Sequence, residues 1–494
     1  MWMSGTVKAG FRAARALNRA GWASGRGIVH GKISFAAIAA MLAGIQASAQ
    51  GPLPEPTGRP MEIDFSSDPV LQLRRQQTSF EAFRASIASA VERHPGTAEA
   101  VAGEDEAMGV LREARSASMP TVDATVTSYR VIARDFSNDP SNIIERSRPI
   151  QRTDAILSAQ QTIFDFGATQ RRISAAGARL RAAGAELEAI GDRVALNAVA
   201  AWYDVFAYRA LVSLTEAFVE SQRELRVAVE IRIREGASAE GDLARIDSYI
   251  AQALTRLARF QRQLANAEAR FTELTGAPPP PDLNRAPTPG GTIMTRDDAA
   301  LASMDAPEVR TARALADASR QEARAARADE LPQISAGIDA GRYGVFENER
   351  DYDIRGRIAM RWRLLGNTEA RSDQASARAR SADARAERIA EEAARDAAIA
   401  WSDVRALERQ LEAIETAYIA SRRSRDVIAE RFRAARGTLF DVVAAEDAFF
   451  ESATSYIQSL TELDAARYIL LSRTGRLLEV LRIDADQLRG EGER

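Results

Sequence analysis

Apolar residues recur at alternating intervals of three and four along several stretches of the chain. The longest run covers residues 243–274, and shorter runs cover residues 173–194 and 404–418. This spacing places the apolar side chains on one face of an α-helix and is typical of a coiled coil. Because several of these positions are alanine, the pattern predicts long helices that pack closely side by side.

Two long stretches contain no proline, residues 150–277 and residues 333–494. Within the first, residues 168–235 can form one helix, on the order of 100 Å long at 1.5 Å per residue. We expect this helix to turn at residues 236–241, and its counterpart in the second stretch to turn at residues 436–438, because glycine interrupts both patterns. The chain is therefore predicted to contain two long helical hairpins.

The two hairpins belong to an internal repeat. Ala201-Trp202-Tyr-Asp-Val205 returns as Ala400-Trp401-Ser-Asp-Val404, and the spacing from Pro95 to Pro120 returns from Pro307 to Pro332. These correspondences predict a leader at residues 1–49, an N-terminal extension at 50–78, repeat 1 at 79–278, a linker at 279–303, repeat 2 at 304–483 and a tail at 484–494.

Each repeat also contains two stretches in which apolar and polar residues alternate, as in β-strands. They cover residues 122–127 and 154–164 in the first repeat, and residues 333–341 and 354–364 in the second. The last stretch is the sharpest, because one of its faces carries Arg355, Arg357, Arg361 and Arg363. Such strands occur in ordinary sheets that lie on a core, and also in membrane barrels with lipid on one face and water on the other.

Composition removes several chemistries. The 494 residues include no cysteine and two histidines, which excludes a thiolate nucleophile, a disulfide framework and a Cys/His zinc cluster. A secreted hydrolase with paired carboxylates is one hypothesis, but pairs such as Asp351 and Asp353 arise easily among 69 acidic residues, and no metal or nucleophile motif surrounds them. We therefore predict no enzyme and no cofactor.

Charge separates a basic leader from an acidic body. Both lysines, Lys8 and Lys32, lie in the first 49 residues, which contain no Asp or Glu. An apolar run at residues 33–45 and the sequence Ala47-Ser48-Ala49 follow, which predicts a secretory signal peptide cleaved before Gln50. No later run of 18 apolar residues predicts a membrane-spanning helix, and the acidic body argues against nucleic acid as a partner.

Beside an export signal and two long rods, the strands favour a membrane barrel. Four strands cannot close one, because the smallest outer-membrane barrels have about eight. An open edge in lipid would leave backbone groups unpaired, at a cost of several kcal/mol each. The predicted fold class is therefore mostly α with a membrane β-barrel that several chains share.

The sequence resembles the TolC family of outer-membrane ducts over about residues 79–483. The likeness rests on the two repeats, on the prolines in His94-Pro95, Met119-Pro120, Ala306-Pro307 and Leu331-Pro332, and on Thr162 to Gly167, Arg436 to Asp447 and Ala466 to Gly475. It implies a homotrimer in which each chain gives four strands to a 12-stranded outer-membrane barrel, continued into the periplasm by an α-helical barrel. The location would be the outer membrane of a Gram-negative bacterium.

The resemblance also implies a function and partners. It suggests a passive conduit that contacts outer-membrane lipid and works with a periplasmic adaptor (membrane fusion) protein and an inner-membrane ABC exporter or RND pump. The second hairpin and Thr474 to Leu481 look most like ducts of type I protein secretion. The alternative is the outer-membrane component of an RND-type multidrug efflux pump. A periplasmic coiled-coil adaptor is more remote, since one hairpin and an anchor would be expected.

Three groups of candidate site residues follow from the resemblance. The family's periplasmic constriction implies Asp441, with Glu446 and Asp447 as further candidates, because Ala444 stands where a second aspartate is usual; capping of the returning helix is the other reading of Asp441. The adaptor-docking hairpin tips would be Gly236, Ser238, Gly241, Arg436, Gly437 and Thr438. Arg355, Arg357, Arg361 and Arg363 would line the barrel lumen and make it electropositive.

Overall fold

The computed structural model describes residues 53–489, apart from 138, 290–294, 348–350 and 435. The predicted signal peptide, with its cleavage site at Ala47, Ala49 and Gln50, lies outside the described residues. Among the helices of the described residues, none combines the length and the hydropathy that crossing a membrane requires.

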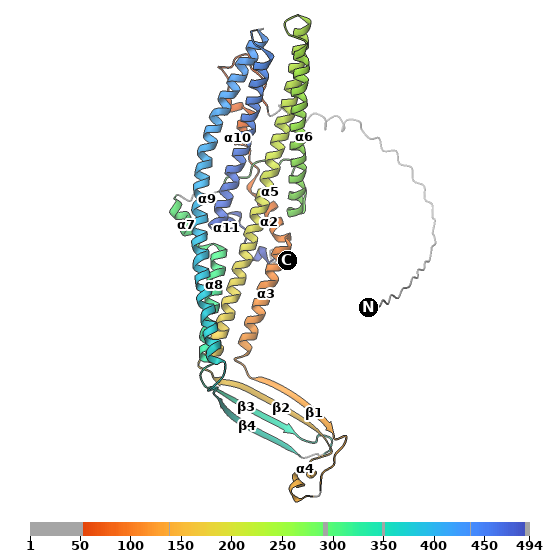
Figure 1. Cartoon of the computed structure of the whole chain (residues 1–494), viewed down its shortest axis with the longest axis vertical. Helices are drawn as coiled ribbons and strands as arrows, with labels where there is room; N and C mark the ends of the chain where they lie inside the picture. Colours follow the sequence, from red (N-terminus) through yellow and green to blue (C-terminus); the bar gives the residue numbers. More distant parts are fainter. Residues whose placement is uncertain (1–52, 138, 290–294, 348–350, 435, 490–494) are drawn as a thin grey trace, which may run out of the picture. The chain divides into compact units, whose positions relative to one another are not determined.

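Helices dominate the chain, with four strands in two pairs (Figure 1). The α-helices are α1 (Pro69–Gln72), α2 (Phe80–Arg93), α3 (Pro95–Ser116), α4 (Ile143–Ser147), α5 (Ala168–Arg234), α6 (Gly241–Thr275), α7 (Arg296–Ala302), α8 (Pro307–Ala328), α9 (Thr368–Arg433), α10 (Leu439–Arg473), α11 (Leu477–Leu481) and α12 (Ala485–Leu488). The strands are β1 (Thr121–Arg130), β2 (Gln151–Phe164), β3 (Gln333–Arg342) and β4 (Tyr352–Arg361), and the short 3-10 helices are η1 (Phe65–Ser67), η2 (Pro140–Asn142) and η3 (Ser303–Asp305).

Two helices, α5 and α9, run the whole length of the helical part (Figure 1). They contain 67 and 66 residues, which confirms the single long helix predicted over residues 168–235. In the half next to the sheet, α8 lies between α5 and α9, and α3 lies against α5. In the other half, α10 lies between α5 and α9, and α6 lies against α5. Each half is thus a layer four helices wide.

The predicted coiled-coil seam of residues 243–274 is confirmed in α6. Its buried residues include Ile246, Ala253, Phe260 and Ala267, which follow one another every seven residues and pack toward α5. A seven-residue repeat keeps one face of the helix turned to its neighbour. Alternation with alanine leaves room for the two helices to approach closely.

Proline and glycine set several of the helix ends. Pro95 and Pro307 occupy the first turns of α3 and α8, where a helix does not use the missing N–H. Gly276 ends α6 and Gly475 follows α10, with φ of 76° and 68°. Glycine adopts this left-handed conformation without steric cost, so the chain can leave each helix sharply.

The four strands form one antiparallel sheet in the order β1-β2-β3-β4. The central pair, β2 and β3, joins the two repeats. The observed strands contain the segments predicted at residues 122–127, 154–164 and 333–341. The fourth prediction is too long: β4 ends at Arg361, so Arg363 lies beyond the strand.

The main apolar core lies at the middle of the helical layer, where α2, α5, α6, α11 and α12 meet. Trp202 is its centre: the ring is fully buried, lies 5.2 Å from the Phe83 ring, and donates from Nε1 to the Asn284 carbonyl at 2.9 Å. A second apolar core fills the space between α5, α9 and α10.

The half next to the sheet is held differently. Its helices α8 and α9 meet through alanines, among them Ala312, Ala316 and Ala386. Ion pairs join α5 to α8 and α8 to α9: Arg172 with Asp329, Arg179 with Glu322, Arg181 with Asp317, Arg310 with Glu188, and Arg320 with Asp383. Because these pairs are exposed, each is worth only about 0–1 kcal/mol.

The segment predicted as a linker, residues 279–303, contains a helix that the sequence analysis did not predict. Helix α7 begins with a capping box, in which the Thr295 hydroxyl accepts from the Asp298 N–H at 3.0 Å and the Asp298 carboxylate accepts from the Thr295 N–H at 3.1 Å. The helix has only seven residues, and it lies against α9. Packing on α9 accounts for so short a helix.

Candidate functional site

The two hairpin tips lie at the same end of the molecule, away from the sheet (Figure 1). The predicted tip residues Gly236 and Ser238 lie in the turn between α5 and α6, and Gly241 is the first residue of α6. Arg436, Gly437 and Thr438 lie between α9 and α10, as predicted. Repeat 1 and repeat 2 therefore present their turns together.

One arginine connects the two hairpins just behind the tips. Arg232, near the end of α5, donates from Nη1 to the carbonyl of Phe432 at 2.8 Å. Its guanidinium carbon also lies 4.2 Å from the centroid of the Phe432 ring. Phe432 belongs to α9, so this contact ties the first hairpin to the second.

Asp441 is exposed in the first turn of α10 and takes part in a capping box. Its Oδ2 accepts from the Thr438 hydroxyl at 2.7 Å and from the Thr438 N–H at 3.2 Å, while the Thr438 hydroxyl accepts from the Asp441 N–H at 3.3 Å. The hydrogen bond from the Thr438 side chain is the main reason that the pKa of Asp441 lies below its ordinary value. The capping role expected as one reading is therefore present, and the carboxylate is also charged and open to solvent.

The other two constriction candidates are placed differently. Glu446 is buried, with its carboxylate 3.7 Å from the Arg425 guanidinium of α9, and burial raises the pKa of Glu446. Asp447 forms an ion pair with Arg256 of α6 at 3.1 Å. Glu446 thus lies inside the chain rather than on the surface where the sequence analysis expected it, because its position falls on the seam between α9 and α10.

The N-terminal extension forms a site that the sequence analysis missed. Residues 53–78, which we call the N-terminal strap, lie along α9. Arg425 donates to the Pro54 carbonyl at 2.8 Å, and the Thr57 N–H donates to Asp426 at 3.3 Å. The strap is therefore attached to charged groups that are themselves buried between helices.

Asp68 is the strongest attachment of the strap. Its carboxylate is buried and accepts from the Tyr418 hydroxyl at 2.9 and 3.0 Å, and it forms an ion pair with Arg422. It also caps α1 by accepting from the N–H groups of Val70 and Leu71 at 2.9 and 3.1 Å. An Asp followed by Pro69 is a local sign of a helix start, but its partners on α9 lie about 350 residues away.

The polar face of the sheet carries the predicted arginines. Arg355 lies opposite Asp339 in the register of β3 and β4, and it pairs with Asp353 on its own strand. Arg357 and Arg361 are also exposed, opposite Gly337 and Gln333.

The other face of the sheet is apolar and uncovered. Ile354 and Ile358 are 67% and 82% exposed, and Val122 and Ile338 also lie largely open. Apolar and polar residues therefore do alternate along the strands. Within the described residues, however, the apolar face of the sheet is not packed against either hydrophobic core. A contiguous exposed apolar face of this kind marks an interaction surface.

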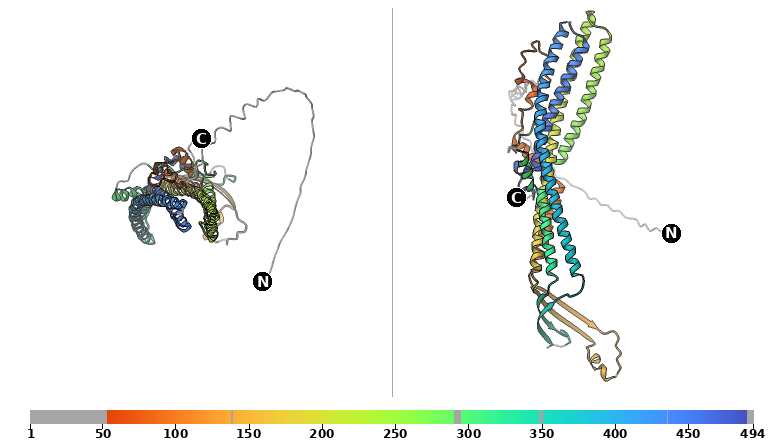
Figure 2. Two further views of the ribbon diagram at one scale, coloured as in Figure 1. Left: turned by 90° about the horizontal axis from the view of Figure 1, so that it is seen from above. Right: turned by 60° about the vertical axis from the view of Figure 1, so that its left-hand side comes forward.

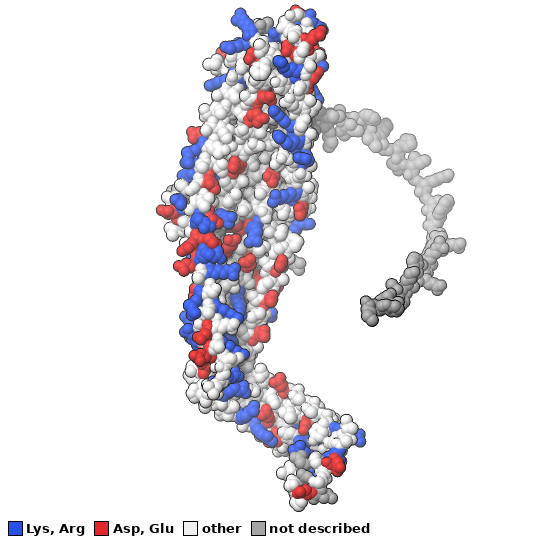
Figure 3. All heavy atoms as spheres, viewed as in Figure 1, with Lys and Arg blue, Asp and Glu red and all other residues white. Residues whose placement is uncertain are grey.

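Charges of both signs are interspersed along the helical face seen in Figure 3. Within the described residues, no group of three or more His, Cys, Asp or Glu side chains is arranged to hold a metal ion. The structure thus offers surfaces, tips and an amphipathic sheet as its functional features.

A comparison with curated proteins by sequence finds no match. Among solved structures, the chain is similar to the outer membrane protein VceC from Vibrio cholerae, with 18% identity, a TM-score of 0.70, and coverage of 80% of this chain and 96% of that one. It is also similar to the CmeC outer membrane channel of Campylobacter jejuni, with 14% identity, a TM-score of 0.68 and coverage of 86% and 93%. The open-state MtrE outer membrane channel of Neisseria gonorrhoeae has 18% identity, a TM-score of 0.67 and coverage of 80% and 89%. At these identities, the likeness establishes the fold.

A family model matches part of the chain. Residues 86–277, which span most of repeat 1 from α2 to α6, match the model described as "Outer membrane efflux protein". That description agrees with the predicted outer-membrane location and with a transport role rather than an enzymatic one. Residues 86–277 therefore match the outer membrane efflux protein family, and the two-repeat fold of the chain is similar to that of solved outer membrane channels.

Proposed function

We propose that the chain forms, as a homotrimer, the outer-membrane duct of a tripartite efflux system. The observation that carries this proposal is the sheet, which has an uncovered apolar face and ends in two edge strands, β1 and β4. In hydrocarbon each unpaired backbone group of an open edge costs several kcal/mol. Joining β1 of one copy to β4 of the next in three copies gives 12 strands without an edge.

The helical layer supports the same assembly. Each half of the layer is four helices wide, so three copies supply 12 helices to a ring at both levels. Because α5 and α9 pass through both levels, a tunnel formed by the sheet end can continue to the hairpin tips. Outer-membrane lipid would cover the apolar face of the sheet. A mass corresponding to one chain for the protein purified in detergent would refute the assembly.

The class of exported cargo depends on which proteins bind at the hairpin tips. The family description names efflux, for which the inner-membrane partner would be an RND pump. The motifs from Arg436 to Asp447 and from Thr474 to Leu481 favour type I protein secretion with an ABC exporter. In both cases a periplasmic adaptor docks at the tips. Because the chain has no native cysteine, Ser238→Cys and Gly437→Cys are unique cross-linking sites. Capture of an RND pump with its adaptor supports efflux, and capture of an ABC exporter supports secretion.

Asp441 is proposed to line the constriction at the periplasmic end. Three copies of an exposed, charged carboxylate around a threefold axis would attract cations. We expect Asp441→Asn to weaken the block of single-channel current by divalent cations in planar bilayers. Asp242→Asn, at the first turn of α6 on the other hairpin, is the matched control and should leave the block unchanged. Equal block in wild type and Asp441→Asn would remove the assignment.

The arginines of β4 are proposed to line the barrel lumen. Arg355→Gln and Arg357→Gln together should shift ion selectivity toward cations, since each trimer loses six positive charges from one end of the pore. Arg363→Gln is the control, because this residue lies beyond the end of β4. Selectivity that ignores the double substitution would place these side chains outside the ion path.

A further inference from the structure

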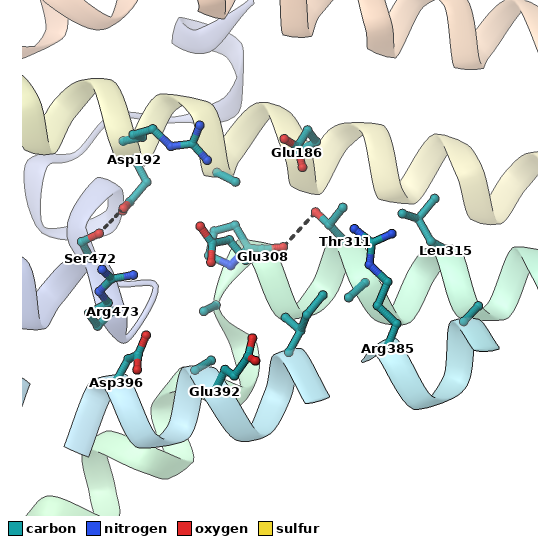
Figure 4. Close-up of a pocket in the computed structure, with 18 of the residues that line it drawn as sticks. Glu186, Asp192, Glu308, Thr311, Leu315, Arg385, Glu392, Asp396, Ser472 and Arg473 are labelled. Atoms are coloured by element: carbon teal, nitrogen blue, oxygen red, sulfur yellow. Dashed lines mark hydrogen bonds between the residues drawn. The ribbon is translucent and has the colours of Figure 1, made fainter. Parts of the chain in front are cut away.

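The helical layer contains a hollow of about 630 Å³ where α8 begins between α5 and α9 (Figure 4). Its apolar lining includes Ala189, Ala312, Leu315 and Ile389. The end of α10, at Ser472 and Arg473, closes one side. The hollow therefore lies at the joint between the two halves of the layer, where α10 stops and α8 starts.

The hollow opens on the uncovered side of the layer. On α5, Leu187 and Val194 belong to the main core, and a Cβ on Gly191 would touch Leu488 of α12. At 100° per residue, Glu186 and Arg193 project from the opposite side of the same helix. Figure 2 (left) shows the long helices as a curved layer with the short C-terminal helices on its convex side. The hollow is thus on the concave side, which faces the tunnel in the proposed trimer.

Charged side chains of both signs surround the apolar lining. The carboxylates are Glu186, Asp192, Glu308, Glu392 and Asp396, and the guanidiniums are Arg193, Arg378, Arg385 and Arg473. With five acidic and four basic groups, the lining is close to electrical balance. A simple anion or a simple cation would therefore meet carboxylates and guanidiniums together in the hollow.

The arginines of the hollow differ from those around it. Arg310 and Arg320 of α8 are taken up in ion pairs with Glu188 and Asp383. Among the described residues, neither Arg378 nor Arg385 has such a carboxylate partner, whereas Arg473 interacts electrostatically with Asp192. The guanidiniums of Arg378 and Arg385 keep their full capacity to bind an anionic group.

Charges of both signs occur along the hollow, but Arg385 and Glu308 lie apart. Figure 4 shows Arg385 and Leu315 at one end, and Asp192, Glu392 and Asp396 with Arg473 at the other, with Glu308 and Glu186 between them. Glu308 and Leu315, which lies beside Arg385, are seven residues apart on α8, a rise of about 10 Å. Asp192 is buried and already accepts a hydrogen bond from Ser472, whereas Glu308 is exposed and makes no ion pair within the described residues.

We propose that this hollow binds a zwitterion whose two charges are separated by an apolar body. The anionic group lies against Arg385, the cationic group lies against Glu308, and the apolar body covers Leu315 and Ile389. This goes beyond a passive conduit, because the wall then holds one class of solute. This proposal rests on the proposed function only in one respect, that the concave side of the layer faces the tunnel.

The probe is 8-aminooctanoic acid, whose charges are about 10 Å apart when the chain is extended, close to the rise between Glu308 and Leu315 on α8, the latter beside Arg385. Octanoic acid and octylamine are matched controls that carry one charge each. Binding to the purified trimer in lipid nanodiscs is measured by saturation-transfer NMR titration. We expect the zwitterion to bind at least fivefold more tightly than either control. Equal affinity of octanoic acid, or no binding of the zwitterion, would overturn the proposal.

Variants locate the binding. Arg385→Gln and Glu308→Gln should each weaken the binding of 8-aminooctanoic acid by fivefold or more. Arg324→Gln, an exposed arginine of α8 outside the hollow, should leave it unchanged. The melting temperature of each variant checks its fold, and the conductance of each variant reports separately on the duct. Unchanged affinity in both hollow variants would overturn the site, and their conductance would still test the duct.

Discussion

Removing the carboxylate of Asp68 should detach the N-terminal strap from α9. In Asp68→Ala, the Arg422 guanidinium and the Tyr418 hydroxyl both lose their buried partner, and α1 loses its cap. The Asp68 side chain is fully buried, and that of Arg422 is 10% exposed. Water therefore replaces the lost contacts poorly.

The magnitude follows from these contacts. Leaving a buried charge without its partner costs about 3–5 kcal/mol. Loss of a helix N-cap costs about 0.5–2 kcal/mol, but the same carboxylate serves both roles, so the two figures are not additive. Taking about 3 kcal/mol as the lower bound, with about 1.4 kcal/mol per factor of ten, the open population of the strap rises roughly a hundredfold.

Limited trypsin digestion measures that population. Arg74 is held in an ion pair with Glu415 of α9, and its cleavage requires the strap to leave the helix. When opening is fast compared with cleavage, the rate follows the open population. Mass spectrometry of the fragment ending at Arg74 should show cleavage at least roughly a hundredfold faster in Asp68→Ala.

Asp64→Ala is the matched control. Asp64 also caps a short helix of the strap, η1, but its side chain is exposed and has no partner on α9 in the described residues. Cleavage after Arg74 should therefore stay close to the wild-type rate. Equal rates in Asp68→Ala and Asp64→Ala would refute the claim that the buried carboxylate holds the strap.

Three further changes test the packing of the helical layer. Burial raises the pKa of Asp192 to about 6 from 3.8, so the folded state has its full stability from this group below pH 4 and loses it as the pH rises through 6. Asp192→Asn should therefore stabilise the protein by about 3 kcal/mol at pH 7.5 and have little effect at pH 4. Equal gains in urea unfolding at both pH values would contradict this. Gly475→Ala combines a φ of 68° with a Cβ 2.9 Å from the Ala306 Cα, so its melting temperature should fall further than that of Gly236→Ala, whose φ is 74° but whose Cβ meets nothing within 4 Å. Trp202→Ala should cost about 3–5 kcal/mol in the same urea assay, and a loss below about 1 kcal/mol would show that its pocket collapses.

Most of the fold could be predicted from the sequence because it is written in short-range patterns. The seven-residue repeat, the proline-free stretches and the glycines mark α5 and α6 within a residue or two at each end. Strand alternation likewise marks the four strands. Helix α7 was not predicted, because a seven-residue helix depends on packing against α9 rather than on its own propensity.

The candidate site residues also differ in whether nearby sequence could predict their role. The capping role of Asp441 could be anticipated, since its partner Thr438 is three residues away. Glu446 could not, because burial depends on which side of α10 faces α9. The Asp68 cluster was also invisible, as nothing near Asp68 indicates an arginine on another helix.

The sequence alone therefore determined the long helices, the repeat and the amphipathic strands. Only the tertiary structure decided which charges are buried, which arginines keep no partner at the hollow beside α8, and where the N-terminal strap lies. The physical reason is range. Periodicity and turn chemistry act between residues a few positions apart, whereas the desolvation of a charge depends on every element packed against it.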